Sequence, residues 1–275
     1  MTKRIVTAVC ALALFIPICI YSYTIVFPLA MAVLCVVATN EMLGCIGVKK
    51  NYIISSISYV IAAAMPLLPS FIDEHTMELE MALCVIYLIG VFTAVVLDKG
   101  TLDYTYAASV FMGVFYVCIS FTSIVMLREE SDFLYLTVFI GPWLSDTFAY
   151  FVGRRFGKHK LIPTISPNKT VEGSIGGIVG GSLSITLFGV VVYNLIDKSL
   201  TPHYYALAVS GIVISVISQI GDLAASAIKR RFGIKDFGFV FPGHGGVLDR
   251  FDSVLLTAPV VYIISQLPIV SGRLI

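Results

Sequence analysis

The residues of this chain that could do chemistry concentrate between Ser226 and Asp252, a segment that joins two strongly apolar stretches. Ionisable groups beside hydrocarbon cost free energy and are kept mainly for function, so these charges indicate a site. Acidic and basic members alternate, as they must where cations and phosphates are bound together. The pattern predicts phosphate chemistry at a membrane surface. The charged and titratable residues of the segment are Lys229, Arg230, Arg231, Lys235, Asp236, His244, Asp249, Arg250 and Asp252.

Aspartates of this region could bind a divalent cation. Asp222 lies near the end of one apolar stretch, and Ser226 and Lys229 follow it at helical spacings that share its face. Asp249 and Asp252 share a face at the start of the next stretch. Because Mg²⁺ is usually held by one or two carboxylates together with substrate phosphates, Asp222 and Asp249 are the predicted ligands. The alternative is that Asp222 only pairs with a neighbouring Lys or Arg, which would make its burial tolerable.

A glycine-rich turn, Pro242 to Gly246, comes directly before these aspartates. Glycine lets the backbone turn sharply and approach a ligand closely. His244, within the turn, lies between the predicted metal and phosphate groups. We therefore expect His244 to contact substrate.

A second motif runs from Ser166 to Gly173 and reads SPNKTVEG. It places Lys169 at the entrance of a predicted helix, where free amides and the helix dipole favour anions. Ser166 and Lys169 are therefore predicted to bind substrate, although Ser166 or Thr170 could instead only cap the helix. The glycine pairs that follow indicate close packing against another helix, and the order of residues is not that of a P-loop.

Asp146 lies inside another apolar stretch, about two turns before its end. An ionisable residue at such a depth is a functional candidate by default. It is predicted either as a third metal ligand or as a residue that orients a basic side chain.

Composition indicates what must position these residues. The chain has 275 residues, of which 58% are hydrophobic and 13% charged, and its mean hydropathy is +0.94. Soluble domains carry roughly 25% charged residues, so the deficit favours a polytopic membrane protein. The six cysteines are scattered without CxxC spacing, which is typical of packing residues rather than of disulfides or a zinc site.

The sequence predicts an all-α integral membrane protein with about nine transmembrane helices. The first two stretches could instead form one long helix. We divide the chain into N-terminal transmembrane helices, 1–130, and a C-terminal catalytic region, 131–275. The nine stretches are 5–20, 24–40, 52–69, 79–97, 104–126, 132–152, 171–194, 204–228 and 250–270.

The distribution of basic residues predicts the orientation. With a cytoplasmic N-terminus and an outside C-terminus, only Arg128, Lys198 and Arg273 among the 18 Lys and Arg residues lie outside. The basic loops 153–170 and 229–249 then both face the cytoplasm, which predicts a site on the cytoplasmic side.

The motifs as a group resemble those of the CTP:phosphatidate cytidylyltransferases, also called CDP-diacylglycerol synthases. The likeness is dense over residues 140–255, whereas the first half is similar only in hydropathy and length. Asn168 departs from the pattern, because family members often have a second lysine there. The stretches that carry the resemblance are SDTFAYFVGRRFGKHK, SPNKTVEGSIGG and SAIKRRFGIKDFGFVFPGHGGVLDRFD.

The resemblance implies that CTP and phosphatidate react to give CDP-diacylglycerol and pyrophosphate in phospholipid biosynthesis. It implies Mg²⁺, with Mn²⁺ as an alternative and a second, monovalent cation such as K⁺. It also implies a homodimer in the lipid bilayer, in the inner membrane if the source is bacterial, with no nucleic-acid partner. The expected catalytic residues are Asp222, Lys229, Asp249, Arg250 and Asp252. Those expected to bind substrate are Ser166, Lys169, Ser226, Arg230, Lys235 and His244.

Two other functions are compatible with buried carboxylates in a membrane protein. A CTP-dependent lipid kinase would transfer the γ-phosphoryl group to an alcohol. An ion-coupled secondary transporter, which is not an enzyme, should show repeated halves with broken helices at the bilayer midplane. Here the charges gather instead in the second half of the chain.

Overall fold

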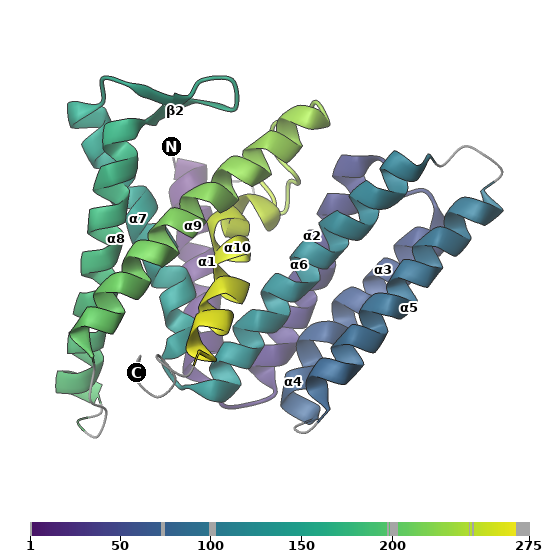
Figure 1. The fold of residues 1–275 in the computed structure, drawn as a ribbon, viewed down its shortest axis with the longest axis horizontal. Helices are drawn as coiled ribbons and strands as arrows, with labels where there is room; N and C mark the ends of the chain where they lie inside the picture. The colour runs from purple at the N-terminus through teal and green to yellow at the C-terminus, as the bar shows by residue number, and fades with distance from the viewer. Residues whose placement is uncertain are drawn as a thin grey trace. The chain divides into compact units, whose positions relative to one another are not determined.

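A computed structural model describes residues 2–72, 75–98, 103–196, 198, 203–241, 243 and 245–267. It is mostly helical, as the sequence predicts (Figure 1). The helices are α1 (Thr2–Ile20), α2 (Val26–Ile46), α3 (Tyr52–Ala64), a 3₁₀ turn (Met65–Leu67), α4 (Leu68–Phe71), α5 (Thr76–Leu97), α6 (Tyr104–Glu130), α7 (Leu134–Phe156), α8 (Val171–Val191), a π-helical turn (Val192–Ile196), α9 (Tyr204–Arg231) and α10 (Leu248–Ser265).

Each predicted apolar stretch contains helix, and the first two form separate helices, α1 and α2. Within the described residues, six helical segments are long and apolar enough to cross a membrane. The count of about nine spans and the orientation of the termini stay predictions. The six segments are Val26–Ile46, Tyr52–Phe71, Thr76–Leu97, Tyr104–Glu130, Val171–Ile196 and Tyr204–Arg231.

One element departs from the all-α prediction. The basic loop before α8 contains two short antiparallel strands, β1 (Lys160–Ile162) and β2 (Ser166–Thr170). Neither strand has the apolar alternation that marks a strand in a sequence. The hairpin carries the predicted substrate residues Ser166 and Lys169.

The helices divide into two compact units. The first contains Met1–Glu129 and Arg231–Phe251, and the second contains Glu130–Arg230 and Asp252–Ile275. The predicted division into 1–130 and 131–275 stays a prediction.

In the first unit, α2 and α6 supply much of the core. A Cβ atom at Gly113 of α6 would lie 2.8 Å from Cγ of Met42, so the glycine lets the two helices approach closely. The segment that returns from residue 231 joins this core, because the rings of Phe121 and Phe251 lie 5.4 Å apart. The five cysteines whose side chains are described form no disulfide.

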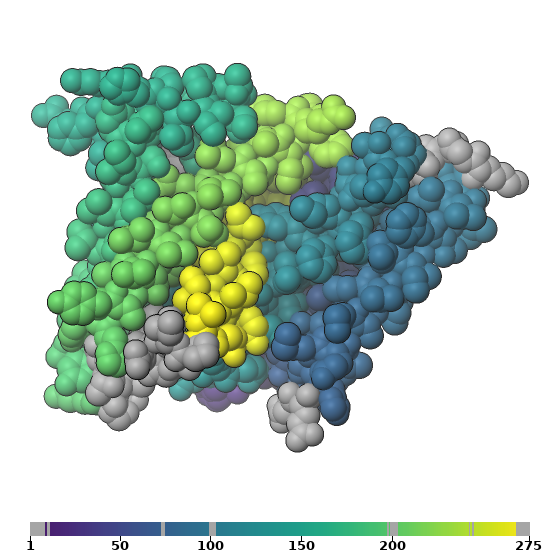
Figure 2. Space-filling view, viewed as in Figure 1, coloured from purple at the N-terminus to yellow at the C-terminus, as the bar shows by residue number. Residues whose placement is uncertain are grey.

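The helix α5 belongs to the outer surface of the first unit, next to α3 (Figure 1). Only Tyr87, Val91 and Ala94 of its 22 residues are buried. Figure 2 shows α5 open along the viewed face over most of its length. Most of its exposed side chains are large and apolar, as expected of a surface that faces lipid: Met77, Leu79, Met81, Val85, Ile86, Ile89, Phe92, Val96 and Leu97.

In the second unit, α7 and α8 pack closely along their length, with β2 beyond the start of α8 (Figure 1). A Cβ atom at Gly173 would lie 2.8 Å from the carbonyl oxygen of Ala149, and one at Gly177 would lie 2.9 Å from that of Ser145. Side chains at these positions would push the helices apart. The predicted glycine packing face is therefore confirmed.

Candidate active site

Lys169 lies near the end of β2, and its ammonium group forms an ion pair with the carboxylate of Asp222 on α9. The two side chains are 26% and 25% exposed, so the pair is partly shielded from water. Thr170 is the N-cap of α8 and accepts a hydrogen bond from the amide of Gly173 at 3.1 Å. Capping is thus the role of Thr170, whereas the side chain of the neighbouring Lys169 pairs with Asp222.

Two more carboxylates of the second unit belong to the same cluster. Asp146 of α7 interacts electrostatically with Asp222 and Lys169. Asp252 of α10 interacts with Asp222 and Asp146, and also with the ammonium group of Lys229. Asp146, Lys169, Asp222, Lys229 and Asp252 therefore form one site, which we call the carboxylate–lysine cluster.

A close approach of two helices brings the cluster together. Gly221 comes directly before Asp222, and a Cβ atom there would lie 2.8 Å from the carbonyl oxygen of Asp252. The glycine therefore lets α9 lie against α10 at the level of both aspartates. Gln219, two residues before Gly221, ties α9 to α8. Its side chain accepts a hydrogen bond from the hydroxyl of Ser174 and donates one to the carbonyl oxygen of Ser174.

The hairpin that carries Lys169 is held by Glu172 in the first turn of α8. Its carboxylate accepts hydrogen bonds from the backbone amides of Lys158, at 3.0 Å, and His159, at 3.2 Å. The His159 ring lies 2.6 Å from the same carboxylate and is largely exposed. Sequence reasoning gave Glu172 no role, although it follows Lys169 within the recognised motif.

The cluster suits a hard divalent cation by the chemistry of its donors. Mg²⁺ prefers carboxylate oxygens and is usually bound by one or two of them together with substrate phosphates. Among the described residues, no group of three or more His, Cys, Asp or Glu side chains is arranged to enclose a metal ion. Carboxylates together with a substrate phosphate are the donor set that Mg²⁺ usually has, and the cluster supplies the carboxylates.

Asp249 belongs to the first unit and is 5% exposed. Its Oδ2 atom accepts hydrogen bonds from the backbone amides of Phe237, at 2.8 Å, and Gly246, at 2.9 Å. Asp249 thus holds the segment before α10 in place. Its predicted role as a metal ligand stays a prediction, as does the catalytic role of the exposed Arg250.

The glycine-rich turn has the sharp geometry expected of it. Gly243 and Gly245 have φ angles of 80° and 81°, in the left-handed region that glycine adopts without strain. His244 lies outside the described residues, so its predicted contact with substrate is untested. The amides at the end of the turn all donate hydrogen bonds to carboxylates. The amide of Gly246 donates to Asp249, and those of Val247 and Leu248 donate to Glu41 of α2.

Glu41 is the residue of this region that sequence reasoning missed. The only available signal was a lone acidic side chain next to an apolar stretch. Its partners lie 206 and 207 residues away, so no local pattern points to them.

The remaining predicted residues have no described contact with the cluster. Ser226 is half-buried, one helical turn after Asp222, and Ser166 is half-buried at the start of β2. Arg230 ends the second unit and is exposed, and Lys235, in the first unit, is also exposed. Their predicted contacts with substrate stay predictions.

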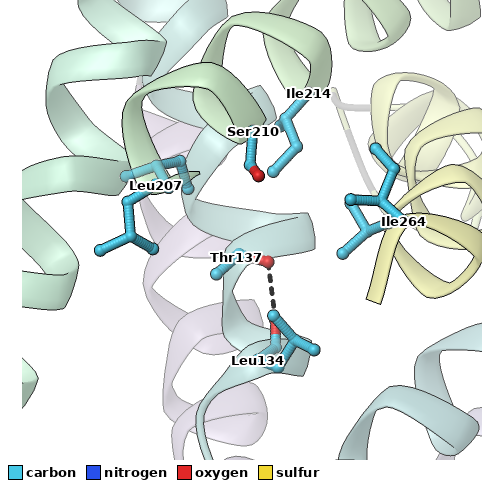
Figure 3. A pocket seen from close by; sticks show the side chains of 8 residues that line it. Leu134, Thr137, Leu207, Ser210, Ile214 and Ile264 are labelled. Atoms are coloured by element: carbon cyan, nitrogen blue, oxygen red, sulfur yellow. Dashed lines mark hydrogen bonds between the residues drawn. The ribbon is translucent and has the colours of Figure 1, made fainter. Parts of the chain in front are cut away.

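A small cavity in the second unit lies apart from these residues (Figure 3). Its volume is about 10 Å³, which is close to the least that one water molecule needs. A nucleotide could not enter it. It is lined by Leu134, Thr137, Ile185, Leu207, Ser210, Ile214, Val261 and Ile264.

Comparison with known proteins identifies the family. Residues 2–267 match the model of the cytidylyltransferase family. The chain belongs to this family. As a cytidylyltransferase-family member it is an enzyme of the nucleotidyltransferase class, and the resemblance found in the motifs is confirmed.

Curated relatives in this family include three from staphylococci, each named phosphatidate cytidylyltransferase. Those of Staphylococcus haemolyticus and Staphylococcus aureus are 34% identical to the chain, and that of Staphylococcus epidermidis is 37% identical. Each alignment spans 264 residues, which is 96% of this chain and 98% of the relative. The similarity therefore includes the first half, where the motifs alone showed only hydropathy and length.

Proposed function

We propose that this protein transfers the cytidylyl group of CTP to phosphatidate, which yields CDP-diacylglycerol and pyrophosphate. The observation that carries the proposal is the carboxylate–lysine cluster, in a chain that aligns over nearly its whole length with relatives named for this activity. Neither the lipid kinase nor the transporter has comparable support.

In the proposed reaction a phosphate oxygen of phosphatidate attacks the α-phosphorus of CTP. The bond from that phosphorus to the oxygen that bridges it to the β-phosphate breaks, and pyrophosphate leaves with the bonding electrons. No covalent intermediate with the protein is needed. Positioning and charge stabilisation supply most of the catalysis in related phosphoryl transfers. The protein must therefore bring two polyanions together, which two lysines among carboxylates are suited to do.

Lys169 and Lys229 are the proposed phosphate donors of the cluster. In the free protein, Lys169 is paired with Asp222. Phosphate oxygens compete for its ammonium group as charge-assisted acceptors. An Asp222 released in this way has its lone pairs available for a cation. Substrate and cation should therefore bind cooperatively at this pair.

A bound Mg²⁺ would neutralise phosphate charge and help to align the displacement. Asp222, together with Asp146 or Asp252, would hold it, because these carboxylates share the cluster. Ligation by Asp249, the use of Mn²⁺ and a second cation such as K⁺ stay part of the proposal without support from the described contacts.

We place the protein in the bilayer as a multi-pass enzyme with about nine spans and a cytoplasmic site. The six segments long and apolar enough to span support the membrane location, and the basic loops support the orientation. Since the relatives come from bacteria, the membrane would be the cell's inner membrane. The active unit is proposed to be a homodimer, as the family resemblance implies.

The proposal is tested by incubating purified protein with CTP, phosphatidate and Mg²⁺ in mixed micelles. We expect CDP-diacylglycerol and pyrophosphate in equal amounts, and neither product without phosphatidate. CDP together with a newly phosphorylated lipid would show a kinase instead.

A further inference from the structure

Glu41 lies in α2 and is 5% exposed. Both of its carboxylate oxygens accept hydrogen bonds from backbone amides at the start of α10. Oε1 accepts a hydrogen bond from the amide of Val247, and Oε2 accepts one from the amide of Leu248, each at 2.9 Å. All three residues belong to the first unit. An anion at this end of a helix is favoured by the free amides and by the helix dipole. Glu41 is therefore a cap for α10 supplied from the other end of the chain.

Two glycines make room for this carboxylate. A Cβ atom at Gly238 or at Gly246 would lie 2.3 Å from Oε1 of Glu41. Neither residue is among the glycines with positive φ, so the backbone conformation does not call for glycine at either position. Glycine is required at both positions because the Glu41 carboxylate approaches so closely. These two glycines of the segment from Ser226 to Asp252 thus make room for a side chain that lies outside this segment.

Glu41 and Asp249 together fix the entry to α10. Asp249 accepts hydrogen bonds from the amides of Phe237 and Gly246. Glu41 accepts hydrogen bonds from the next two amides along the chain, those of Val247 and Leu248. The helix that begins there carries Asp249, Arg250 and Asp252 in its first turns. A shift or fraying of its first turn would therefore displace residues predicted to act on the substrates.

We propose that Glu41 is a positioning residue for the cytidylyl transfer. It holds the first turn of α10 in the register that the reaction needs, without touching either substrate. The inference rests on the proposed function and adds to it a residue of the first half of the chain.

The test uses three variants of the full-length protein. Glu41→Gln keeps the shape of the side chain but leaves one acceptor oxygen, so one of the two amides loses its partner. Glu41→Asp keeps both oxygens on a shorter side chain. Gly246→Ala adds a Cβ atom that must displace the carboxylate. The matched control is Glu129→Gln, because Glu129 is an exposed carboxylate of the same unit that accepts a hydrogen bond from Ser70.

For each variant, kcat per folded molecule and the hydrogen exchange of the 246–248 amides are measured. We expect kcat to fall at least tenfold in Glu41→Gln and in Gly246→Ala, with faster amide exchange, and to take an intermediate value in Glu41→Asp. Combining Glu41→Gln with Gly246→Ala should cost little more than either alone, because both break one interaction. Glu129→Gln should match the wild type.

The outcomes distinguish a failure of the Glu41 inference from a failure of the proposed function. If the wild type forms CDP-diacylglycerol and Glu41→Gln and Gly246→Ala retain its kcat while their amides exchange faster, Glu41 serves only stability and the inference is wrong. Unprotected 247 and 248 amides in the wild type would contradict the cap itself. A wild type that forms no product would instead contradict the proposed function.

Discussion

At the scale of single residues, the ion pair between Lys169 and Asp222 is the central interaction of the cluster. Partly shielded pairs are costly to break on one side only, because the remaining charge then lacks a partner. Exchange of partners avoids this cost if a phosphate reaches Lys169 as a cation reaches Asp222. The resting pair thereby keeps both groups in place before the substrates bind.

Lys169→Ala should lower kcat/KM by at least about a hundredfold, the scale seen when one electrostatic donor is removed from an active site. Lys169→Arg should lie between this variant and the wild type, because a planar fork does not reproduce a compact charge. Steady-state rates at subsaturating CTP give the comparison. Lys160→Ala, an exposed lysine of the same hairpin, is the control. Near-normal turnover of Lys169→Ala would assign Lys169 to membrane anchoring alone.

The carboxylates Asp222 and Asp249 should respond differently to substitution by asparagine. Asp222→Asn removes a charge from the cluster, so activity should fall at least about a hundredfold while the protein stays folded. Asp249→Asn should also lose activity, and its 237 and 246 amides should exchange faster because a charged acceptor is lost. Raising Mg²⁺ separates the roles, since only a weakened metal site is rescued by excess metal. Wild-type rates at low Mg²⁺ in Asp249→Asn would exclude it as a ligand.

At the scale of elements, glycines decide how closely the helices approach. In the second unit, α8 meets α7 through Gly173 and Gly177, and α9 meets α10 through Gly221. The first contact supports the hairpin of Lys169 and the second aligns Asp222 with Asp252. Packing between small residues thus determines the geometry of the cluster.

Gly177→Ala should destabilise the fold by about 1–3 kcal/mol, the usual cost of overpacking, because its Cβ atom would meet the backbone of Ser145. Gly44→Ala is the matched control. No atom lies within 4 Å of its added Cβ atom, so it should be neutral or stabilising by up to about 1 kcal/mol. Thermal unfolding in detergent gives both values. Equal stability of the two variants would contradict the close packing of α7 on α8.

Much at this scale could be predicted from the sequence, because long apolar runs and helical spacing act locally. Helix formed in every predicted stretch, and the spacing placed Asp222 and Ser226 correctly on one helix. The hairpin could not be predicted because its strands are short and mostly polar. The role of Glu41 could not be predicted because its hydrogen-bond partners lie more than 200 residues away, and only the folded chain brings them together.

At the scale of the whole molecule, the orientation in the bilayer decides whether both substrate motifs can reach CTP. A cysteine placed at Ser131 should be labelled from outside, and one placed at Ser166 only from the cytoplasm, in a background that lacks the native cysteines. A membrane-impermeant maleimide on oriented vesicles measures this, and permeabilised vesicles provide the control. Labelling of both sites from one side would overturn the orientation and the shared cytoplasmic site.

In the proposed reaction, the α-phosphorus of CTP is transferred to phosphatidate at the carboxylate–lysine cluster. The most direct measurement follows CTP labelled separately at the α- and γ-phosphorus, with wild-type protein and Asp222→Asn. In the wild type, we expect the α-label in the lipid product and the γ-label in pyrophosphate, and in Asp222→Asn a rate at least about a hundredfold lower. A γ-label in the lipid would contradict cytidylyl transfer, and undiminished transfer by Asp222→Asn would contradict the cluster as its site.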